Sequence, residues 1–277
     1  MSQFFTYQRL LCLVLFLGLA PILISCSEKK EEPTGKINKV WLIGDSTMAN
    51  YALEENYQSN RHPITGWGQV FQPFMAKDSL SQISHLVQAD SLIVDDRAKG
   101  GRSTRTFFQE GRWRAVYNEM QPGDLVLIQF GHNDAAVTKT ERYVDVEGYQ
   151  EFLRLFIQQT REKGGTPILL TPVARNYPWE NGRLKNVHGD YPDAMKAVAF
   201  ELDVLLIDLN QRSMDHFSEK GKAHVSATYF MNLPAGVYEA YPDGQDDNTH
   251  FQPAGARAVA GLVFEGLKNV GNNNLNQ

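Results

Sequence analysis

Cysteine is almost absent from this chain of 277 residues, which contains only Cys12 and Cys26. Both lie within the first 26 residues. The rest of the sequence therefore offers no thiol for a disulfide, a zinc site or thiol catalysis. A fold built from it must be stabilised by its hydrophobic core, and a chain of this length can form one.

An excess of positive charge is lacking too. The chain has 27 Lys and Arg residues against 32 Asp and Glu residues, a formal net charge of −5. Domains that bind nucleic acid usually carry a basic patch or stripe, so we expect no nucleic-acid partner. With 42% hydrophobic and 21% charged residues, the composition is otherwise that of an ordinary globular protein.

The main apolar run, residues 10–24, is shorter than the roughly 20 residues that a membrane-spanning helix needs. It follows Arg9 and ends in Leu23-Ile24-Ser25-Cys26. This pattern resembles a bacterial lipoprotein signal, in which a cysteine is lipidated after cleavage. We therefore interpret residues 1–25 as a signal peptide and Cys26 as the lipidation site. The alternative is an uncleaved membrane anchor with an incidental cysteine.

The charged residues 26–36 then form a solvated, lipid-anchored tether. A lipid anchor at Cys26 predicts attachment to a membrane of the bacterial cell envelope. The sequence leaves open whether the protein faces the periplasm or the cell exterior.

Short apolar segments alternate with amphipathic ones from residue 37 to residue 270. This alternation indicates one α/β domain, a three-layer α/β/α sandwich around a parallel sheet of about five strands. Residues 271–277 are expected to be a disordered tail, and residues 218–249 to be largely irregular. The expected strands are 39–44, 91–98, 124–130, 166–173 and 204–209, and the expected helices are 104–120, 147–163, 193–202 and 253–268.

Polar clusters follow the predicted strands at the points where these strands end. They are Gly44-Asp45-Ser46, Gly100-Gly101 and His132-Asn133-Asp134, and a fourth cluster, 246–250, precedes the last helix. Because the carboxyl ends of parallel strands meet at one edge of the sheet, the clusters can converge there. Together they supply a hydroxyl, a tight-turn N–H, a side-chain amide and a carboxylate–imidazole pair. Acyl transfer needs these four parts.

Each cluster taken alone also has a purely structural explanation. Asp45 or Ser46 could cap the next helix, as Asp and Ser commonly do. Asp247 could cap the last helix while His250 packs at its start. The spacing of Asp247 and His250 equally lets the carboxylate bind one imidazole nitrogen while the other nitrogen faces Ser46. The presence of all four clusters favours the catalytic explanation.

The four clusters resemble, in the same order, the four sequence blocks of the SGNH (GDSL) hydrolase superfamily. Three longer forms are similar to its rhamnogalacturonan acetylesterase branch. The resemblance spans residues 44–250 and implies an SGNH/flavodoxin-like fold. The longer forms are Gly44-Asp45-Ser46-Thr47-Met48, Gly101-Arg102-Ser103-x-Arg105 and Asp247-Asn248-Thr249-His250-Phe251.

The resemblance also implies a role for each site residue. Ser46 would be the nucleophile, His250 the general base and then acid, and Asp247 the residue that orients His250. The donors to the oxyanion would be the backbone N–H groups of Ser46 and Gly101 and the side-chain amide of Asn133. Gly100 remains the alternative to Gly101.

Two further groups of residues could be given a function. Asp243, Asp246, Asp247 and His250 suggest a metal site, but an ion-binding loop usually has more spaced oxygen ligands, so we expect neither metal nor cofactor. Arg102 and Arg105 could contact an acidic polysaccharide or pair with carboxylates of the domain.

The sequence thus predicts a lipid-anchored serine esterase. The resemblance implies that it deacetylates a carbohydrate, with an acetylated pectic polysaccharide such as rhamnogalacturonan as substrate. Other enzymatic possibilities are an acetylxylan esterase, another short-chain acyl esterase, a lipase or a transacylase. The non-enzymatic alternative is a glycan-binding surface lipoprotein.

Overall fold

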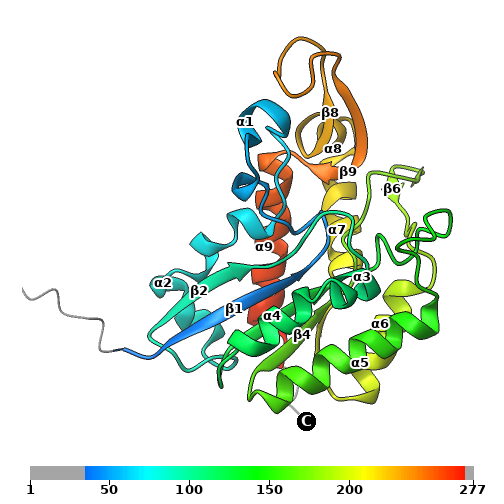
Figure 1. Cartoon of the computed structure of the whole chain (residues 1–277). Coiled ribbons are helices and arrows are strands. Elements are labelled where there is room, and N and C mark those ends of the chain that lie inside the picture. The colour runs from blue at the N-terminus through cyan, green and yellow to red at the C-terminus, as the bar shows by residue number, and fades with distance from the viewer. Residues whose placement is uncertain (1–34, 272–277) are drawn as a thin grey trace, which may run out of the picture. The chain divides into compact units, whose positions relative to one another are not determined.

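A parallel sheet of five strands forms the centre of the computed structural model, which describes residues 35–271 (Figure 1). The strand order β2-β1-β3-β4-β7 confirms the predicted α/β architecture. The predicted signal peptide, Cys26, the tether up to residue 34 and the tail from residue 272 lie outside the described residues. The strands are β1 (Ile37–Gly44), β2 (Ser91–Asp96), β3 (Leu125–Gln129), β4 (Thr166–Leu170) and β7 (Leu205–Ile207).

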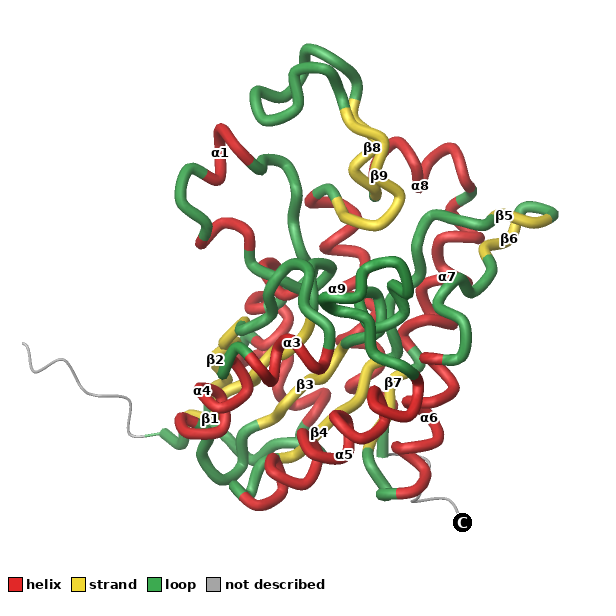
Figure 2. Tube along the Cα trace, turned by 45° about the vertical axis from the view of Figure 1, so that its right-hand side comes forward, coloured by secondary structure: helices red, strands yellow, loops and turns green. Residues whose placement is uncertain are grey.

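Helices cover both faces of the sheet (Figures 1 and 2). Because successive strand residues point to opposite faces, Val40 and Leu42 join one apolar cluster, and Trp41 and Ile43 join the other. Burial on both faces explains why β3 is apolar almost throughout. The longer helices are α4 (Arg112–Glu119), α5 (Val146–Glu162), α6 (Tyr191–Glu201), α7 (Leu209–Lys220) and α9 (Pro253–Asn269). No helix within 35–271 combines the length and apolarity needed to cross a bilayer.

The remaining elements are short. The helices are α1 (Tyr57–Asn60), α2 (Lys77–Leu80), α3 (Thr104–Gln109) and α8 (Lys222–Thr228), with 3-10 turns at Tyr51–Leu53, Gly68–Val70, Gln72–Met75 and Ser81–Ile83. Two small antiparallel ribbons pair β5 (Trp179–Glu180) with β6 (Arg183–Leu184), and β8 (Phe230–Leu233) with β9 (Gln245–Phe251).

The structure corrects two expectations about secondary structure. The predicted helix 104–120 is divided into α3 and α4 at Gly111, whose φ of 72° is left-handed and interrupts the helix. Residues 218–249, expected to be largely irregular, contain the end of α7, all of α8 and β8, and the start of β9. The β8–β9 ribbon lies beyond the carboxyl ends of the parallel strands in both views (Figures 1 and 2).

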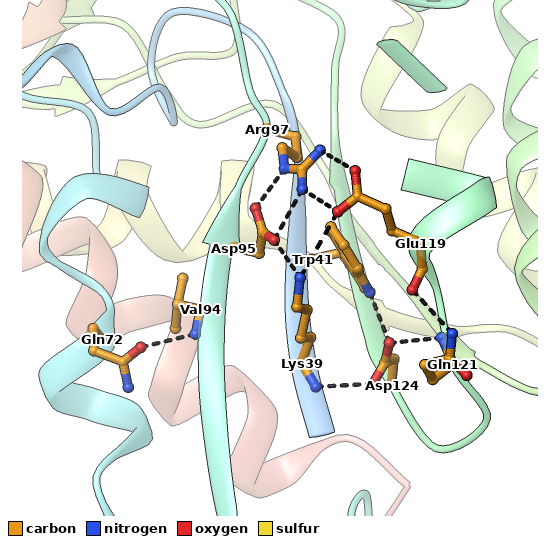
Figure 3. Close-up of polar contacts among 9 residues, drawn as sticks. All are labelled: Lys39, Trp41, Gln72, Val94, Asp95, Arg97, Glu119, Gln121 and Asp124. Carbon is orange, nitrogen blue, oxygen red and sulfur yellow. Dashed lines mark hydrogen bonds and ion pairs between the residues drawn. The ribbon is translucent and has the colours of Figure 1, made fainter. Parts of the chain in front are cut away.

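A polar network holds the amino-terminal ends of β1 and β3 together (Figure 3). The buried Asp124 carboxylate accepts hydrogen bonds from the Lys39 backbone N–H at 2.8 Å and from Trp41 Nε1 at 2.9 Å. Lys39 Nζ and the Arg97 guanidinium lie 4.2 and 4.9 Å from the Trp41 ring centroid, and both also pair with Asp95. Charges and hydrogen bonds thus connect the start of β3 and the end of β2 to β1.

The opposite end of β1 lies at the point where the strand order reverses. The chain passes from β1 to β2 on one side and then returns to β3 on the other side. In open α/β sheets this reversal creates the crevice in which ligands bind. Gly44 ends β1 there, and a Cβ at this position would lie 2.6 Å from the Gln129 carbonyl oxygen, so only glycine fits.

Candidate active site

Ser46 lies in the turn that follows β1. Asp45, which is fully buried, stabilises this turn because its Oδ1 accepts both the N–H and the Oγ1–H of Thr47 at 2.9 Å. The Ser46 carbonyl oxygen accepts a hydrogen bond from Tyr51 Oη at 2.9 Å. Asp45 therefore acts as the cap of the turn, and the Ser46 side chain faces a cavity.

This cavity has a volume of about 360 Å³, within the range of small-molecule sites. Its lining includes Ser46, Gly101, Asn133 and His250, which come from all four sequence clusters. Asp247 is joined to the cavity through His250. The structure thus brings together residues that are as far apart in sequence as Ser46 and His250.

Gly101 contributes its backbone to the cavity from the turn between β2 and α3. Its φ of +78° is left-handed, a conformation that favours glycine. Gly100 is not among the lining residues of this cavity. A Cβ on Gly100 would, however, lie 3.7 Å from the Ser46 Cβ, so both glycines are near Ser46 and the choice of Gly101 as N–H donor stays a prediction.

Asn133 lies in the loop after β3 with one of its amide hydrogens engaged. Its Nδ2 donates to the Arg102 carbonyl oxygen at 2.9 Å. This bond orients the amide, and the second hydrogen on Nδ2 remains available for a ligand.

Asp134 braces the same loop. Its Oδ1 accepts the N–H and Oγ1–H of Thr104, and its Oδ2 accepts the Gly131 N–H. Burial raises the pKa of Asp134 to about 7, although the bonds from Thr104 act in the opposite direction. The loop that carries Asn133 is thus fixed to the start of α3.

Asp247 and His250 lie on β9, with His250 Nδ1 2.7 Å from Asp247 Oδ2. Asp247 Oδ1 also accepts the backbone N–H groups of Thr249 and His250. Burial alone would raise the pKa of Asp247, but the hydrogen bond and charge of His250 outweigh it and hold this pKa below its ordinary 3.8. The carboxylate is therefore ionised at neutral pH.

Because Nδ1 of His250 faces Asp247, Nε2 is the nitrogen left for the cavity. Within residues 35–271 no hydrogen bond joins Ser46 Oγ to this ring. Catalytic hydrogen bonds are often long when no substrate is bound, so this geometry is compatible with general-base action.

A small apolar cluster positions the β8–β9 ribbon beside the segment that follows Ser46. Met231 and Leu233 of β8 pack with Ala49, Tyr51 and Ile64. The Thr65 N–H also donates to the Phe251 carbonyl oxygen at 2.9 Å. These contacts explain why a histidine near the end of the chain comes to the end of the first strand.

A second carboxylate–imidazole pair lies beneath the cavity, and the sequence did not reveal it. Asp45 Oδ2 is 3.1 Å from His132 Nδ1, and both side chains are buried. Burial lowers the pKa of His132, and this effect exceeds the opposing effect of Asp45. Burial also acts to raise the pKa of Asp45, but His132 and Thr47 hold it below 3.8. The pair thus consists of an ionised carboxylate and a neutral imidazole.

Three cations of the cavity could not be identified from the sequence. Lys139, Arg142 and Arg175 line it, although no motif marks them. Of the arginines that the motifs did mark, Arg102 pairs with Glu110 at 3.0 Å. Arg105 donates to the carbonyl oxygens of residues 140 and 143. No group of three potential metal-ligating His, Cys, Asp or Glu side chains occurs in the part of the chain that the structure describes.

Comparison with known proteins gives concordant matches. The model of the GDSL-like Lipase/Acylhydrolase family matches residues 42–258. Rhamnogalacturonan acetylesterase RhgT of Bacillus subtilis is 40% identical over 233 residues, which cover 84% of this chain and 90% of RhgT. The probable rhamnogalacturonan acetylesterase YesY of the same organism is 40% identical over 235 residues, 84% of this chain and 94% of YesY.

Among solved structures, the crystal structure of YxiM from Bacillus subtilis matches with a TM-score of 0.64 and 27% identity. The match covers 84% of this chain and 56% of YxiM, so the chain spans little more than half of that protein. The TM-score indicates a shared fold over the aligned part.

Proposed function

Since the chain belongs to the GDSL-like lipase/acylhydrolase family, the SGNH hydrolases, we propose that it is a serine esterase that deacetylates rhamnogalacturonan or a closely related pectic polysaccharide. The names of RhgT and YesY support the substrate. The observation that carries the proposal is the position of Ser46 and His250 on one cavity, with His250 bound to the ionised Asp247.

The proposed reaction begins when Ser46 Oγ attacks the carbonyl carbon of an acetyl ester. His250 Nε2 takes the Oγ proton, and Asp247 stabilises the imidazolium that forms. The carbonyl oxygen becomes an oxyanion, which accepts hydrogen bonds from the N–H groups of Ser46 and Gly101 and from Asn133 Nδ2.

In the next step His250 returns its proton to the sugar oxygen, and the bond between that oxygen and the carbonyl carbon breaks. The sugar leaves with a free hydroxyl, and the acetyl group remains on Ser46. His250 then takes a proton from water, which attacks the carbonyl carbon of the acetyl-enzyme. His250 returns this proton to Ser46 Oγ as the bond between Oγ and the carbonyl carbon breaks, and acetate is released.

Acetate release tests this proposal. The substrates are acetylated rhamnogalacturonan, acetylated xylan and simple sugar acetates, and Ser46→Ala is the control. We expect acetate from the pectic polymer with the wild type and none above background with Ser46→Ala. Equal release by the two proteins, or no release from any pectin, would overturn the proposal.

Two further assays separate the alternatives. A fluorophosphonate probe should label the wild type and not Ser46→Ala, whereas a glycan-binding protein without esterase activity would not be labelled. A series of acyl esters should show faster turnover of acetyl than of long-chain esters, whereas a lipase would show the opposite order.

We also propose that the protein is a lipoprotein of the bacterial cell envelope, anchored through Cys26. This proposal depends on the sequence of residues 9–26 alone. Metabolic labelling with an alkyne fatty acid should mark the full-length wild type, and Cys26→Ala should abolish the label. A label that persists in Cys26→Ala would exclude this anchor.

A further inference from the structure

Cations border the cavity that holds Ser46 and His250. Lys139, Arg142 and Arg175 line it, and its lining includes no Asp or Glu. The whole chain, by contrast, has a net charge of −5. The cations thus line the cavity directly, whereas the ionised Asp247 and Asp45 lie behind His250 and His132. Cations in such a position attract an anionic ligand.

Arg142 stands beside Gly101 with part of its guanidinium unsatisfied. Its Nη1 lies 3.3 Å from the position that a Cβ on Gly101 would occupy. Its Nε is buried and has no hydrogen-bond partner. The carboxylate paired with it, that of Glu141, is 3.9 Å away and belongs to an exposed side chain, so this ion pair is weak. A ligand oxygen would supply the acceptor that this arginine lacks.

Arg175 is held in place by neutral groups. Its Nη2 donates to the His132 carbonyl oxygen at 3.3 Å, and its Nη1 donates to Tyr177 Oη at 3.0 Å. Within residues 35–271, neither Arg175 nor Lys139 forms an ion pair with a carboxylate. Their charges are therefore not neutralised by the protein.

Of the two arginines in the Gly101-Arg102-Ser103-x-Arg105 motif, Arg102 alone differs in this respect, whereas Arg105 has no carboxylate partner within residues 35–271. Arg102 is neutralised by Glu110, and Arg105 holds two backbone carbonyl oxygens. Of these five cations, Lys139, Arg142 and Arg175 are the ones that line the cavity and can bind a ligand there.

From these contacts we propose that Arg142 and Arg175, assisted by Lys139, form a subsite for the carboxylate of a uronic acid residue next to the acetyl ester. This inference rests on the proposed function, because it assumes a pectic ester at Ser46. Guanidinium groups bind carboxylates through paired hydrogen bonds. Since Arg142 adjoins Gly101, a carboxylate bound there lies close to the acetyl carbonyl. The subsite favours uronate esters over neutral glycan esters such as those of xylan.

The test compares Arg142→Gln, Arg175→Gln and the double variant with the wild type. Arg257→Gln is the matched control, because Arg257 is exposed on α9, does not line the cavity, and its loss changes the net charge equally. The substrates are acetylated rhamnogalacturonan and the same polymer after reduction of its carboxyl groups to neutral alcohols.

We expect the wild type and Arg257→Gln to favour the carboxylated polymer over the reduced one in kcat/KM. Each cavity variant should lose on the order of 10- to 100-fold in kcat/KM on the carboxylated polymer, mainly through KM, as expected for a lost charge-assisted hydrogen bond. The preference for the carboxylated polymer should disappear in the double variant, and higher salt should weaken it in the wild type.

An equal loss on both polymers would overturn the inference, because the arginines would then act on the ester or on the fold. A wild type without preference would overturn it as well. Circular dichroism and fluorophosphonate labelling of Ser46 identify a misfolded variant. A wild type that deacetylates both polymers equally refutes only the subsite, whereas one that releases no acetate from any pectin refutes the proposed function.

Discussion

Asp45 Oδ2 and His132 Nδ1 lie 3.1 Å apart in the interior of the protein. Asp45 directly precedes Ser46, and His132 directly precedes Asn133. This one hydrogen bond therefore joins the loop after β1 to the loop after β3. Together with the bond from Gln129 Nε2 to Thr47 Oγ1 at 2.7 Å, it helps to position the proposed nucleophile relative to the amide proposed to bind the oxyanion.

Asp45→Asn should weaken this connection and lower kcat. The asparagine Oδ1 can keep the bonds from Thr47, but its Nδ2 then faces His132 Nδ1 and requires the other imidazole tautomer. A displacement of about 1 Å at the reacting centre can cost about 10² in rate, so we expect kcat to fall by about 10- to 100-fold with little change in KM. Steady-state kinetics with p-nitrophenyl acetate as substrate measure kcat and KM. A loss confined to KM would contradict the positioning role.

Asn133→Ala should lower kcat by on the order of 10²–10³, the usual effect of removing one oxyanion donor. Its stability should change little, because the side chain makes one hydrogen bond, to the Arg102 carbonyl oxygen. Asn186→Ala is a matched control, since its exposed amide also donates to a backbone carbonyl at 2.9 Å. Near-normal turnover by Asn133→Ala would exclude the assignment.

Asp247→Asn should lower kcat by on the order of 10³–10⁴. The asparagine amide would donate to His250 Nδ1 and leave the proton on Nε2, the nitrogen that must accept the Ser46 proton. Asp246→Asn is the control, because Asp246 is also on β9 but is exposed and binds Asn248. A kcat within tenfold of the wild type would show that Asp247 does not set the tautomer.

Asp124→Asn should destabilise the fold and leave catalysis intact. The Asp124 carboxylate binds the Lys39 N–H, Trp41 Nε1 and the Gln121 N–H, and an amide cannot accept from all of them. Asp124 precedes β3, whereas the cavity lies beyond its carboxyl end. We expect the free energy of unfolding to fall by about 2–4 kcal/mol in urea titrations, with kcat/KM unchanged below the transition. A parallel loss of activity would argue against this separation.

His188 should make the protein less stable as the pH falls. Burial holds its pKa well below its ordinary 6.5, with the charges of His132 and Arg175 acting in the same direction. Below pH 6.5 the unfolded chain therefore binds a proton that the folded chain does not, and unfolding becomes more favourable. One such proton contributes a slope of at most about 1.4 kcal/mol per pH unit.

His188→Gln removes this titration. The free energy of unfolding, measured in urea at pH 7.5, 6.5 and 5.5, should therefore decline less steeply in the variant than in the wild type. Parallel pH profiles for the two proteins would show that His188 is not the source.

The sheet and the positions of Ser46, Gly101 and Asn133 at strand ends could be predicted from the sequence. The buried strands are nearly continuous apolar runs, and each ends abruptly in polar residues. Parallel topology then brings these ends to one edge, which is why residues far apart in the chain could be grouped in advance.

Two features could not be predicted from the sequence, and each has a physical explanation. The pairing of Asp45 with His132 depends on β1 and β3 being neighbours in the sheet. The hydrophobic periodicity of each segment does not predict the order of strands. The strand β9 reads QDDNTHF and has no apolar residue before Phe251, so the alternation that marks a half-buried strand is missing. Its backbone pairs with β8, in a ribbon separate from the parallel sheet.

The sequence does not identify Arg142, Arg175 and Lys139 as site residues, because they lie in loops outside every motif. The two motif arginines were the candidate ligand contacts. In the structure Arg102 pairs with Glu110, and Arg105 donates to backbone carbonyl oxygens. Only the three-dimensional arrangement distinguishes a cation that holds the fold from one that faces a ligand.

The location of His250 on β9 has a consequence for the order of events during synthesis. Ser46 is synthesised first, and a further 250 − 46 = 204 residues, the last of them His250, must be added before His250 is present. At about 5–20 residues per second this takes on the order of 10–40 s. Throughout that time the nascent chain contains the proposed nucleophile without the proposed base. If the proposed roles hold, hydrolytic activity begins only when translation is nearly complete, and incomplete chains have no esterase activity.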